Sequence, residues 1–119
     1  MDNGKLSTHV LDTASGRPAA GMRIALYRLD GGKATPAGEF MTNAQGRTER
    51  PLLEGDAMLP GTYEIAFHVA DYFRAQGSLQ SDPPFLGIVP LRIGLADAGA
   101  HYHVPLLCSP WSYSTYRGS

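Results

Sequence analysis

Short runs in which apolar and polar residues alternate make up most of the chain. In residues 61–69, apolar side chains recur at every second position from Tyr63 to Val69, which is the period of a β-strand. Turn signals rich in Gly, Pro, Asn and Asp separate such runs at intervals of roughly 8–12 residues. The predicted strands are residues 6–11, 22–29, 36–42, 47–53, 61–69, 85–95, 101–108 and 112–117.

Two segments depart from this pattern. Residues 71–77 are predicted to form a short helix, with Asp71 as its N-cap and Gly77 as its C-terminal stop. Pro90 lies inside the run 85–95, so this strand is expected to be broken or to lie at the edge of a sheet. About eight short strands with one short helix indicate an all-β sandwich or barrel.

Length and composition fit one such domain over residues 1–119. The chain has a mass of 12.8 kDa, and its 14 glycines and 9 prolines are easily placed in the turns of an all-β domain. Charged residues make up only 18% of the chain. Because a typical domain has about a quarter, part of the surface is expected to be covered by self-association.

Charge and hydropathy argue against several classes of partner. The formal net charge is -1, which lacks the basic excess of a nucleic-acid-binding protein or of a polybasic membrane anchor. No apolar run approaches the roughly 18 residues that span a bilayer. Residues 1–5 lack the apolar stretch of a signal peptide, so a cytoplasmic location is expected.

The histidines are the clearest candidates for chemistry. Alternation places His9 on the same strand face as Ser7, and His103 on the same face as Pro105. His101 shares that second face but lies at the start of its strand. An imidazole titrates near neutral pH and can transfer protons, although a single histidine is more often a surface or core residue.

A metal centre is not predicted. His101 and His103 could chelate from one strand face, but no third ligand lies at a suitable spacing. Cys108 is the only cysteine, which excludes an intrachain disulfide and a cysteine-based zinc site. It is expected to be a small buried residue. Neither a glycine-rich phosphate loop nor a Gly-x-Ser-x-Gly elbow is present in the sequence.

Three segments carry the most distinctive motifs. The first reads Leu-Ser-Thr-His-Val-Leu-Asp at residues 6–12 and continues with Gly-Arg-Pro-Ala at residues 16–19. The second reads Thr-Asn-Ala-Gln-Gly-Arg at residues 42–47, and the third runs from His101 to the closing Tyr-Arg-Gly-Ser at residues 116–119. Together they resemble the 5-hydroxyisourate hydrolases, the transthyretin-related enzymes of purine degradation. The closing tetrapeptide is the most specific motif, and residues 76–100 are the part least similar to that family.

The resemblance implies both an architecture and a site. The architecture is a transthyretin-like β-sandwich of two four-stranded sheets with one short helix, assembled as a homotetramer, a dimer of dimers, around a central channel whose two mouths hold the active sites. The implied catalytic residues are His9, Arg47, His103 and Ser119. The implied substrate-binding residues are His9, Arg47, Tyr116, Arg117, Gly118 and Ser119.

The implied reaction hydrolyses a cyclic amide of the small-molecule substrate 5-hydroxyisourate. The ring opens to 2-oxo-4-hydroxy-4-carboxy-5-ureidoimidazoline, with no metal or organic cofactor. This chemistry needs a base for water, a cation for the developing oxyanion and an acid for the leaving nitrogen. We expect His9 and His103 to transfer the protons, in an order that the sequence leaves open, and Arg47 to hold the oxygen-rich ring. Ser119 is expected to position the water.

Two other classes of function compete with this one. A non-enzymatic, transthyretin-like carrier could use the same fold, because a fold does not determine a function. A carrier would need an open and more apolar channel, whereas His9, Arg47, His103 and the closing Tyr-Arg-Gly-Ser predict a polar and narrow one. The remaining alternative is a β-sandwich interaction module whose histidines are structural.

Overall fold

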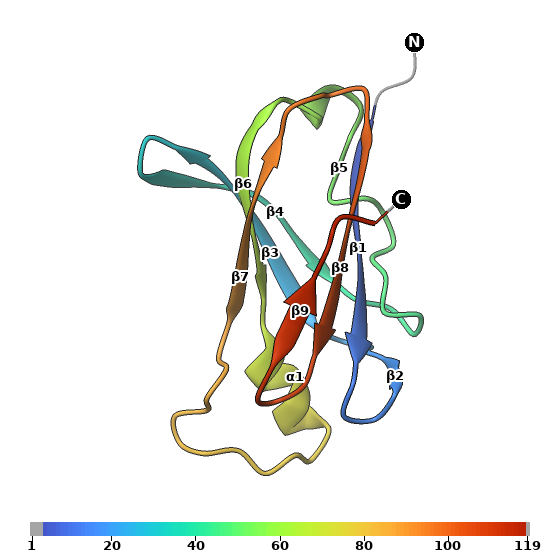
Figure 1. Cartoon of the computed structure of the whole chain (residues 1–119), viewed down its shortest axis with the longest axis vertical. Coiled ribbons are helices and arrows are strands. Elements are labelled where there is room, and N and C mark those ends of the chain that lie inside the picture. Colours follow the sequence, from blue (N-terminus) through green and yellow to red (C-terminus); the bar gives the residue numbers. More distant parts are fainter. Residues whose placement is uncertain (1–3, 119) are drawn as a thin grey trace.

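Two β-sheets form the fold, and a computed structural model describes residues 4–118 of it (Figure 1). The elements in chain order are β1 (Lys5–Asp12), β2 (Arg17–Pro18), β3 (Arg23–Asp30), β4 (Lys33–Met41), β5 (Leu53–Glu54), a 3-10 turn (Gly55–Ala57), β6 (Gly61–Phe67), α1 (Val69–Ala75), β7 (Val89–Leu95), β8 (His101–Cys108) and β9 (Tyr113–Thr115). Within residues 4–118, no helix has the length and apolar character needed to cross a membrane.

The sheet topology confirms the predicted all-β sandwich and corrects its strand count. One sheet has the order β2-β1-β8-β9, and the short β5 also pairs with β1, so this sheet has five strands instead of four. The other sheet has the order β4-β3-β6-β7. Strands β1 and β8 run parallel, and the other pairs run antiparallel.

The predicted strand 47–53 is wrong in its extent. Only Leu53–Glu54 pair as a strand, against Leu6 and Lys5 at the start of β1. Arg47 makes a single isolated bridge, and the chain between the two points bends through Pro51, which has no N–H to give to a strand ladder.

The core lies between the two sheets, and strand alternation selects its residues. In β1, Leu6 and Val10 are fully buried, whereas Ser7 and His9 face the other side of the sheet and are partly exposed. Burying a side chain of this apolar kind stabilises the fold by roughly 1.5–3 kcal/mol. The largest fully buried side chains are Phe67, Phe73, Leu6, Met22, Ile24, Leu26, Ile65, Leu95, Leu106, Val10, Val69 and Val89.

The helix begins two residues earlier than predicted. His68 occupies the N-cap position without a side-chain hydrogen bond, so the prediction of Asp71 as the N-cap is wrong. The reason is packing, because Val69, Tyr72 and Phe73 lie on one face of α1 and are all buried. The C-terminal stop is confirmed, since Gly77 has a φ of 84° beyond the helix end.

The prediction for Pro90 is also confirmed. It lies in β7, which is the edge strand of its sheet and pairs only with β6 among the described strands. An edge strand has one side on which a missing N–H disrupts no strand pairing.

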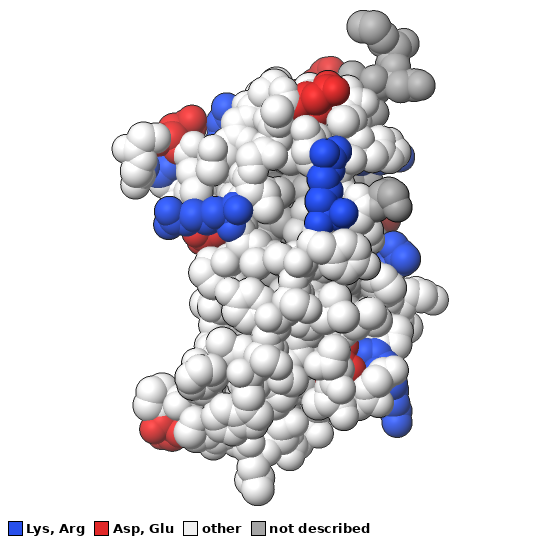
Figure 2. All heavy atoms as spheres, viewed as in Figure 1, with Lys and Arg blue, Asp and Glu red and all other residues white. Residues whose placement is uncertain are grey.

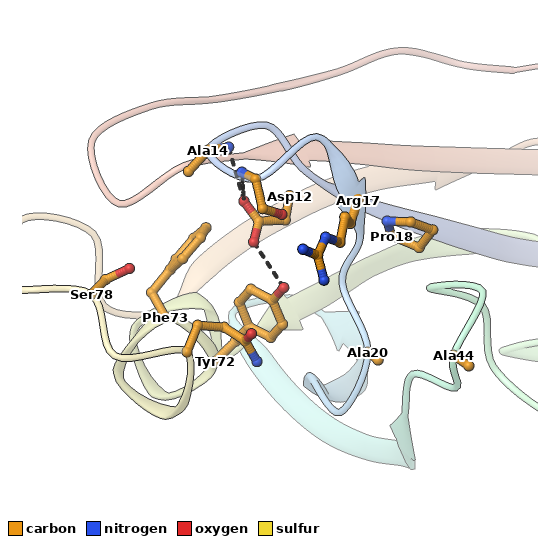
Figure 3. A pocket seen from close by; sticks show the side chains of 11 residues that line it. Asp12, Ala14, Arg17, Pro18, Ala20, Ala44, Tyr72, Phe73 and Ser78 are labelled. Atoms are coloured by element: carbon orange, nitrogen blue, oxygen red, sulfur yellow. Dashed lines mark hydrogen bonds between the residues drawn. The ribbon is translucent and has the colours of Figure 1, made fainter.

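A buried carboxylate ties the end of β1 to α1. Asp12 is 3% exposed and accepts hydrogen bonds from the backbone N–H groups of Ala14 (2.9 Å) and Ser15 (3.0 Å) and from the Tyr72 hydroxyl (2.8 Å) (Figure 3). Burial raises the pKa of Tyr72, and the hydrogen bond to Asp12 raises it further. The phenol therefore remains a hydrogen-bond donor to this carboxylate.

Replacing Asp12 should destabilise the fold measurably. Asp12→Ala leaves the Tyr72 hydroxyl and two backbone N–H groups without their acceptor, and we expect a loss of about 2–4 kcal/mol in the free energy of unfolding, measured by urea denaturation. The matched control is Asp97→Ala, because Asp97 accepts from the Gly99 N–H on an exposed loop. Equal losses of unfolding free energy in the two variants would contradict a structural role for the hydrogen bonds of Asp12.

Candidate active site

The parallel pairing of β1 and β8 brings the two predicted proton-transfer residues together. Ser7 is the register partner of His103, and His9 is the register partner of Pro105. His9 and His103 are therefore diagonal neighbours on one sheet face, where both side chains are partly exposed. Strand β9 pairs with β8 on its other side, so the three strands predicted to carry the site are neighbours (Figure 1).

A tight turn carries Arg47 to the same place. The Asn43 side-chain oxygen accepts the Arg47 N–H at 3.2 Å, and the Gly46 carbonyl accepts the Val10 N–H at 2.8 Å. Gly46 has a φ of 76°, and a Cβ there would overlap the Val10 carbonyl oxygen, so both conformation and space require glycine. An isolated antiparallel bridge then sets Arg47 opposite His9.

The C-terminal segment returns to β8 directly at His103. The Gly118 N–H donates to the His103 carbonyl oxygen at 2.7 Å, in an isolated antiparallel bridge. A Cβ on Gly118 would lie 2.8 Å from Cδ2 of the His103 ring. Such a separation is shorter than van der Waals contact, so glycine is required for this approach.

The other tail residues lie around this bridge. The Arg117 guanidinium is 4.2 Å from the centroid of the Tyr102 ring and donates to the His101 carbonyl oxygen at 3.3 Å. The Tyr116 side chain is 61% exposed. Ser119, a predicted catalytic and binding residue, lies outside the described residues.

Hydrogen bonds distinguish the two imidazoles chemically. His9 Nε2 lies 2.9 Å from the Gln45 carbonyl oxygen, which can only accept, so Nε2 carries the hydrogen. The lone pair of neutral His9 is therefore on Nδ1. In His103 the other ring nitrogen is hydrogen-bonded: Nδ1 lies 2.8 Å from Ser7 Oγ. Within residues 4–118, His103 Nε2 makes no side-chain hydrogen bond and remains available to a substrate.

Electrostatics keep His103 neutral. Burial lowers its pKa below the ordinary 6.5, and the charges of Arg47 and of protonated His9 lower it further. One face thus offers a lone pair, a second imidazole that is neutral near pH 7 and a permanent cation. These groups can take a proton, give a proton and stabilise an oxyanion.

The remaining candidates lie elsewhere. His101 is exposed at the start of β8, and His68 lies at the N-cap of α1, 3.9 Å from Asp71. Cys108 is fully buried, and burial, followed by the nearby Asp12, raises the pKa of its thiol to about 12, which confirms its prediction as a small buried residue. Among residues 4–118, no three His, Cys, Asp or Glu side chains are grouped to hold a metal.

A polar hollow beside α1 is distinct from this site. A hollow of about 540 Å³ lies between the β1–β2 turn and α1, with Asp12, Arg17 and Tyr72 in its wall (Figure 3). None of the predicted site residues lines it. The predicted residues lie instead on an open sheet face.

Two contacts of the candidate histidines are not predicted by the sequence. Ser7 was placed on the His9 face but was given no role, and the Gln45 carbonyl contact was not anticipated. The signal that would have found Ser7 is the pairing register of β1 with β8, which alternation within one strand does not reveal.

Comparison with known proteins identifies the family of the chain. The HIUase/Transthyretin family model matches residues 6–118. The 5-hydroxyisourate hydrolase 2 of Rhizobium meliloti (strain 1021) is 57% identical over 117 residues, which cover 98% of each protein.

Solved structures are similar over the same length. The crystal structure of (S)-allantoin synthase has a TM-score of 0.93 and 50% identity over 99% of this chain and 44% of that one, so this chain spans less than half of that protein. Sea bream transthyretin, solved in complex with thyroxine, has a TM-score of 0.86 and 27% identity, covering 96% of this chain and 94% of that one. On the family match and the 57% identity to a relative of equal length, the chain belongs to the HIUase/transthyretin family.

Proposed function

We propose that this protein is a hydrolase that opens the ring of 5-hydroxyisourate in urate degradation. The observation that carries the proposal is the grouping of His9, Arg47 and His103 on one sheet face, with different ring nitrogens of the two imidazoles engaged in hydrogen bonds. The comparisons favour a hydrolase over a carrier, since identity is 57% to a curated hydrolase and 27% to the transthyretin.

The geometry supports a specific division of labour. His9 accepts a proton from water through Nδ1 as the water oxygen attacks the amide carbon. Arg47 stabilises the negative charge that develops on the carbonyl oxygen. As the carbon–nitrogen bond breaks, the leaving nitrogen takes the Nε2 hydrogen of His103. The proton that His9 took from the attacking water passes through a water molecule to His103 Nε2, so both imidazoles end neutral, as they began. No metal or organic cofactor takes part in these steps.

The tail completes the proposed binding site. Tyr116, Arg117 and Gly118 follow β9 and return to β8 where His103 lies, and Gly118 is the residue in contact with it. We assign Ser119 the role of positioning the attacking water, on the resemblance alone.

Removing either imidazole tests the catalytic assignment. His9→Asn and His103→Asn should each lower the rate at which fresh 5-hydroxyisourate loses its ultraviolet absorbance, by about 10²–10⁴ relative to the parent protein. His68→Asn and His101→Asn are the matched controls and should remain close to the parent. A large effect at His101 with none at His103 would refute the assignment. A parent that binds the compound without accelerating its loss would instead support a carrier.

We also propose a homotetramer, a dimer of dimers, which the family resemblance implies. Strand β7 is one edge of its sheet and β9 is one edge of the other. Ile93 of β7 and Thr115 of β9 line one groove, so these two edges lie side by side. The outer side of each edge lacks a strand partner among residues 4–118. Figure 2 shows a broad area with few charged side chains over this part of the molecule.

Exposed apolar side chains lie beside these edges. Phe85 and Trp111 are 67% and 56% exposed, and their ring centroids are 6.0 Å apart. Contiguous exposed apolar surface of this kind marks interaction sites. A second copy would bury it, and further copies could enclose the open face that carries His9 and His103.

Light scattering tests the assembly. At micromolar concentration the parent should have the mass of four chains of 12.8 kDa. The double variant Phe85→Ser, Trp111→Ser should shift to smaller species, whereas Leu59→Ser, at another exposed apolar residue, should not. A parent of one chain's mass would contradict the tetramer.

Shortening the chain tests the role of the tail. A protein that ends after Thr115 loses the Gly118 hydrogen bond to His103 and the packing of Arg117 on Tyr102, but little buried apolar surface, because Tyr116 is mostly exposed. We expect turnover to fall about a hundredfold or more with only a small change in Tm. Residues added after Ser119 should also lower turnover, and an N-terminal tag is the control. Near-parent turnover of the shortened chain would exclude the tail from the site.

The proposed hydrolase is a single domain over residues 1–119, and its cytoplasmic location is a prediction from the sequence. Neither a nucleic acid nor a membrane is proposed as a partner.

A further inference from the structure

Ser7 and His103 form a hydrogen bond that has no role in the mechanism proposed above. They are register partners in the parallel β1–β8 pairing, so their side chains stand next to one another on the same face. Ser7 Oγ lies 2.8 Å from His103 Nδ1. This is a hydrogen bond between a hydroxyl and one named nitrogen of an imidazole that takes part in the proposed proton transfer.

We infer that Ser7 is a positioning residue that donates its hydroxyl hydrogen to His103 Nδ1 and so holds the hydrogen of the neutral ring on Nε2. The inference rests on the proposed function. A neutral imidazole has one N–H and one lone pair, so a donor at Nδ1 decides which nitrogen faces the substrate as a donor.

The direction of this hydrogen bond follows from the partners of the two groups. Among residues 4–118, His103 Nδ1 is the only hydrogen-bond partner of Ser7 Oγ, and donation to it gives the hydroxyl hydrogen an acceptor within the protein. His9 supplies a second argument, because its Nε2 hydrogen is engaged by the Gln45 carbonyl and its Nδ1 is a lone pair. If the hydroxyl instead accepted from His103, both neutral imidazoles would present lone pairs to the substrate, and His103 Nε2 would carry no hydrogen for the leaving nitrogen.

Gly118 holds the ring from another side. Its backbone lies against Cδ2, where an added Cβ would be only 2.8 Å away. Ser7 at Nδ1 and Gly118 at Cδ2 together define the ring's orientation, and Nε2 is the polar ring atom left without a side-chain hydrogen bond among the described residues. Ser7 therefore sets the tautomer and the backbone of Gly118 limits rotation of the ring.

The tautomer can be observed without substrate. In full-length protein labelled with ¹⁵N-histidine, the two ring nitrogens of His103 are distinguished by their chemical shifts, since a protonated nitrogen resonates far from one with a lone pair. At a pH where His103 is neutral, the parent should show the hydrogen on Nε2. Ser7→Ala should shift the two resonances toward each other as the tautomers mix, and Ser7→Thr, which keeps a hydroxyl, should restore the parent pattern. A parent with its hydrogen on Nδ1, or a spectrum unchanged in Ser7→Ala, would overturn the inference.

Turnover provides the second measurement. Ser7→Ala should lower kcat for 5-hydroxyisourate by about tenfold to a hundredfold, with recovery in Ser7→Thr. The matched control is Thr8→Val, which removes the hydrogen bond from the next hydroxyl of β1 to the Val104 carbonyl (2.7 Å) on the buried face of the same strand pair. Thr8→Val should leave the His103 tautomer unchanged and kcat near the parent value.

Equal losses of kcat in Ser7→Ala and Thr8→Val would mean that both changes act only through strand pairing, which would overturn the inference. A parent that does not hydrolyse 5-hydroxyisourate refutes the proposed function, while the nitrogen spectra still decide the hydrogen bond.

Discussion

The parallel pairing of β1 with β8 is the constraint on which the site depends. It is the one parallel pairing among the described strands, and it joins segments about a hundred residues apart in the sequence. Its register places Ser7 beside His103 and His9 two positions further along the same face. A slip of one residue would turn one histidine into the core and separate the pair, because side chains alternate between the two faces of a strand. The buried side of the same strands, with Leu6, Val10 and Leu106, fixes the register.

Two other elements add groups to this pair. The Asn43 turn brings Arg47 and the Gln45 carbonyl to one side of His9, and the tail brings Gly118 to one side of His103. Both approaches depend on a glycine, Gly46 against β1 and Gly118 against the ring. The scaffold is shared with a transthyretin solved with thyroxine, so chemistry comes from these few contacts and not from the sandwich itself.

The sequence predicted what depends on local patterns. Alternation located β1, β6 and β8 to within one or two residues at each end, and the resemblance named residues that the structure does bring together, His9, Arg47 and His103. The predictions are wrong where tertiary packing determines the start or the length of an element. The helix starts at Val69 because its apolar face needs that residue buried. Strand β5 is only two residues long because it shares one edge of β1 with the Arg47 bridge and with β2. The role inferred for Ser7 depends on register between distant strands, which no local pattern contains.

The central claim is that His9 and His103 act together in one reaction, and a double-mutant cycle tests it most directly. Rates of 5-hydroxyisourate hydrolysis would be compared for the parent, His9→Asn, His103→Asn and the variant with both changes. If the two imidazoles act as a unit in this reaction, the double variant should be about as slow as the slower single variant, because residues that act as a unit have strongly non-additive effects. If the two fold-losses multiply in the double variant, the histidines contribute independently, and the account of a single site built by the β1–β8 pairing is contradicted.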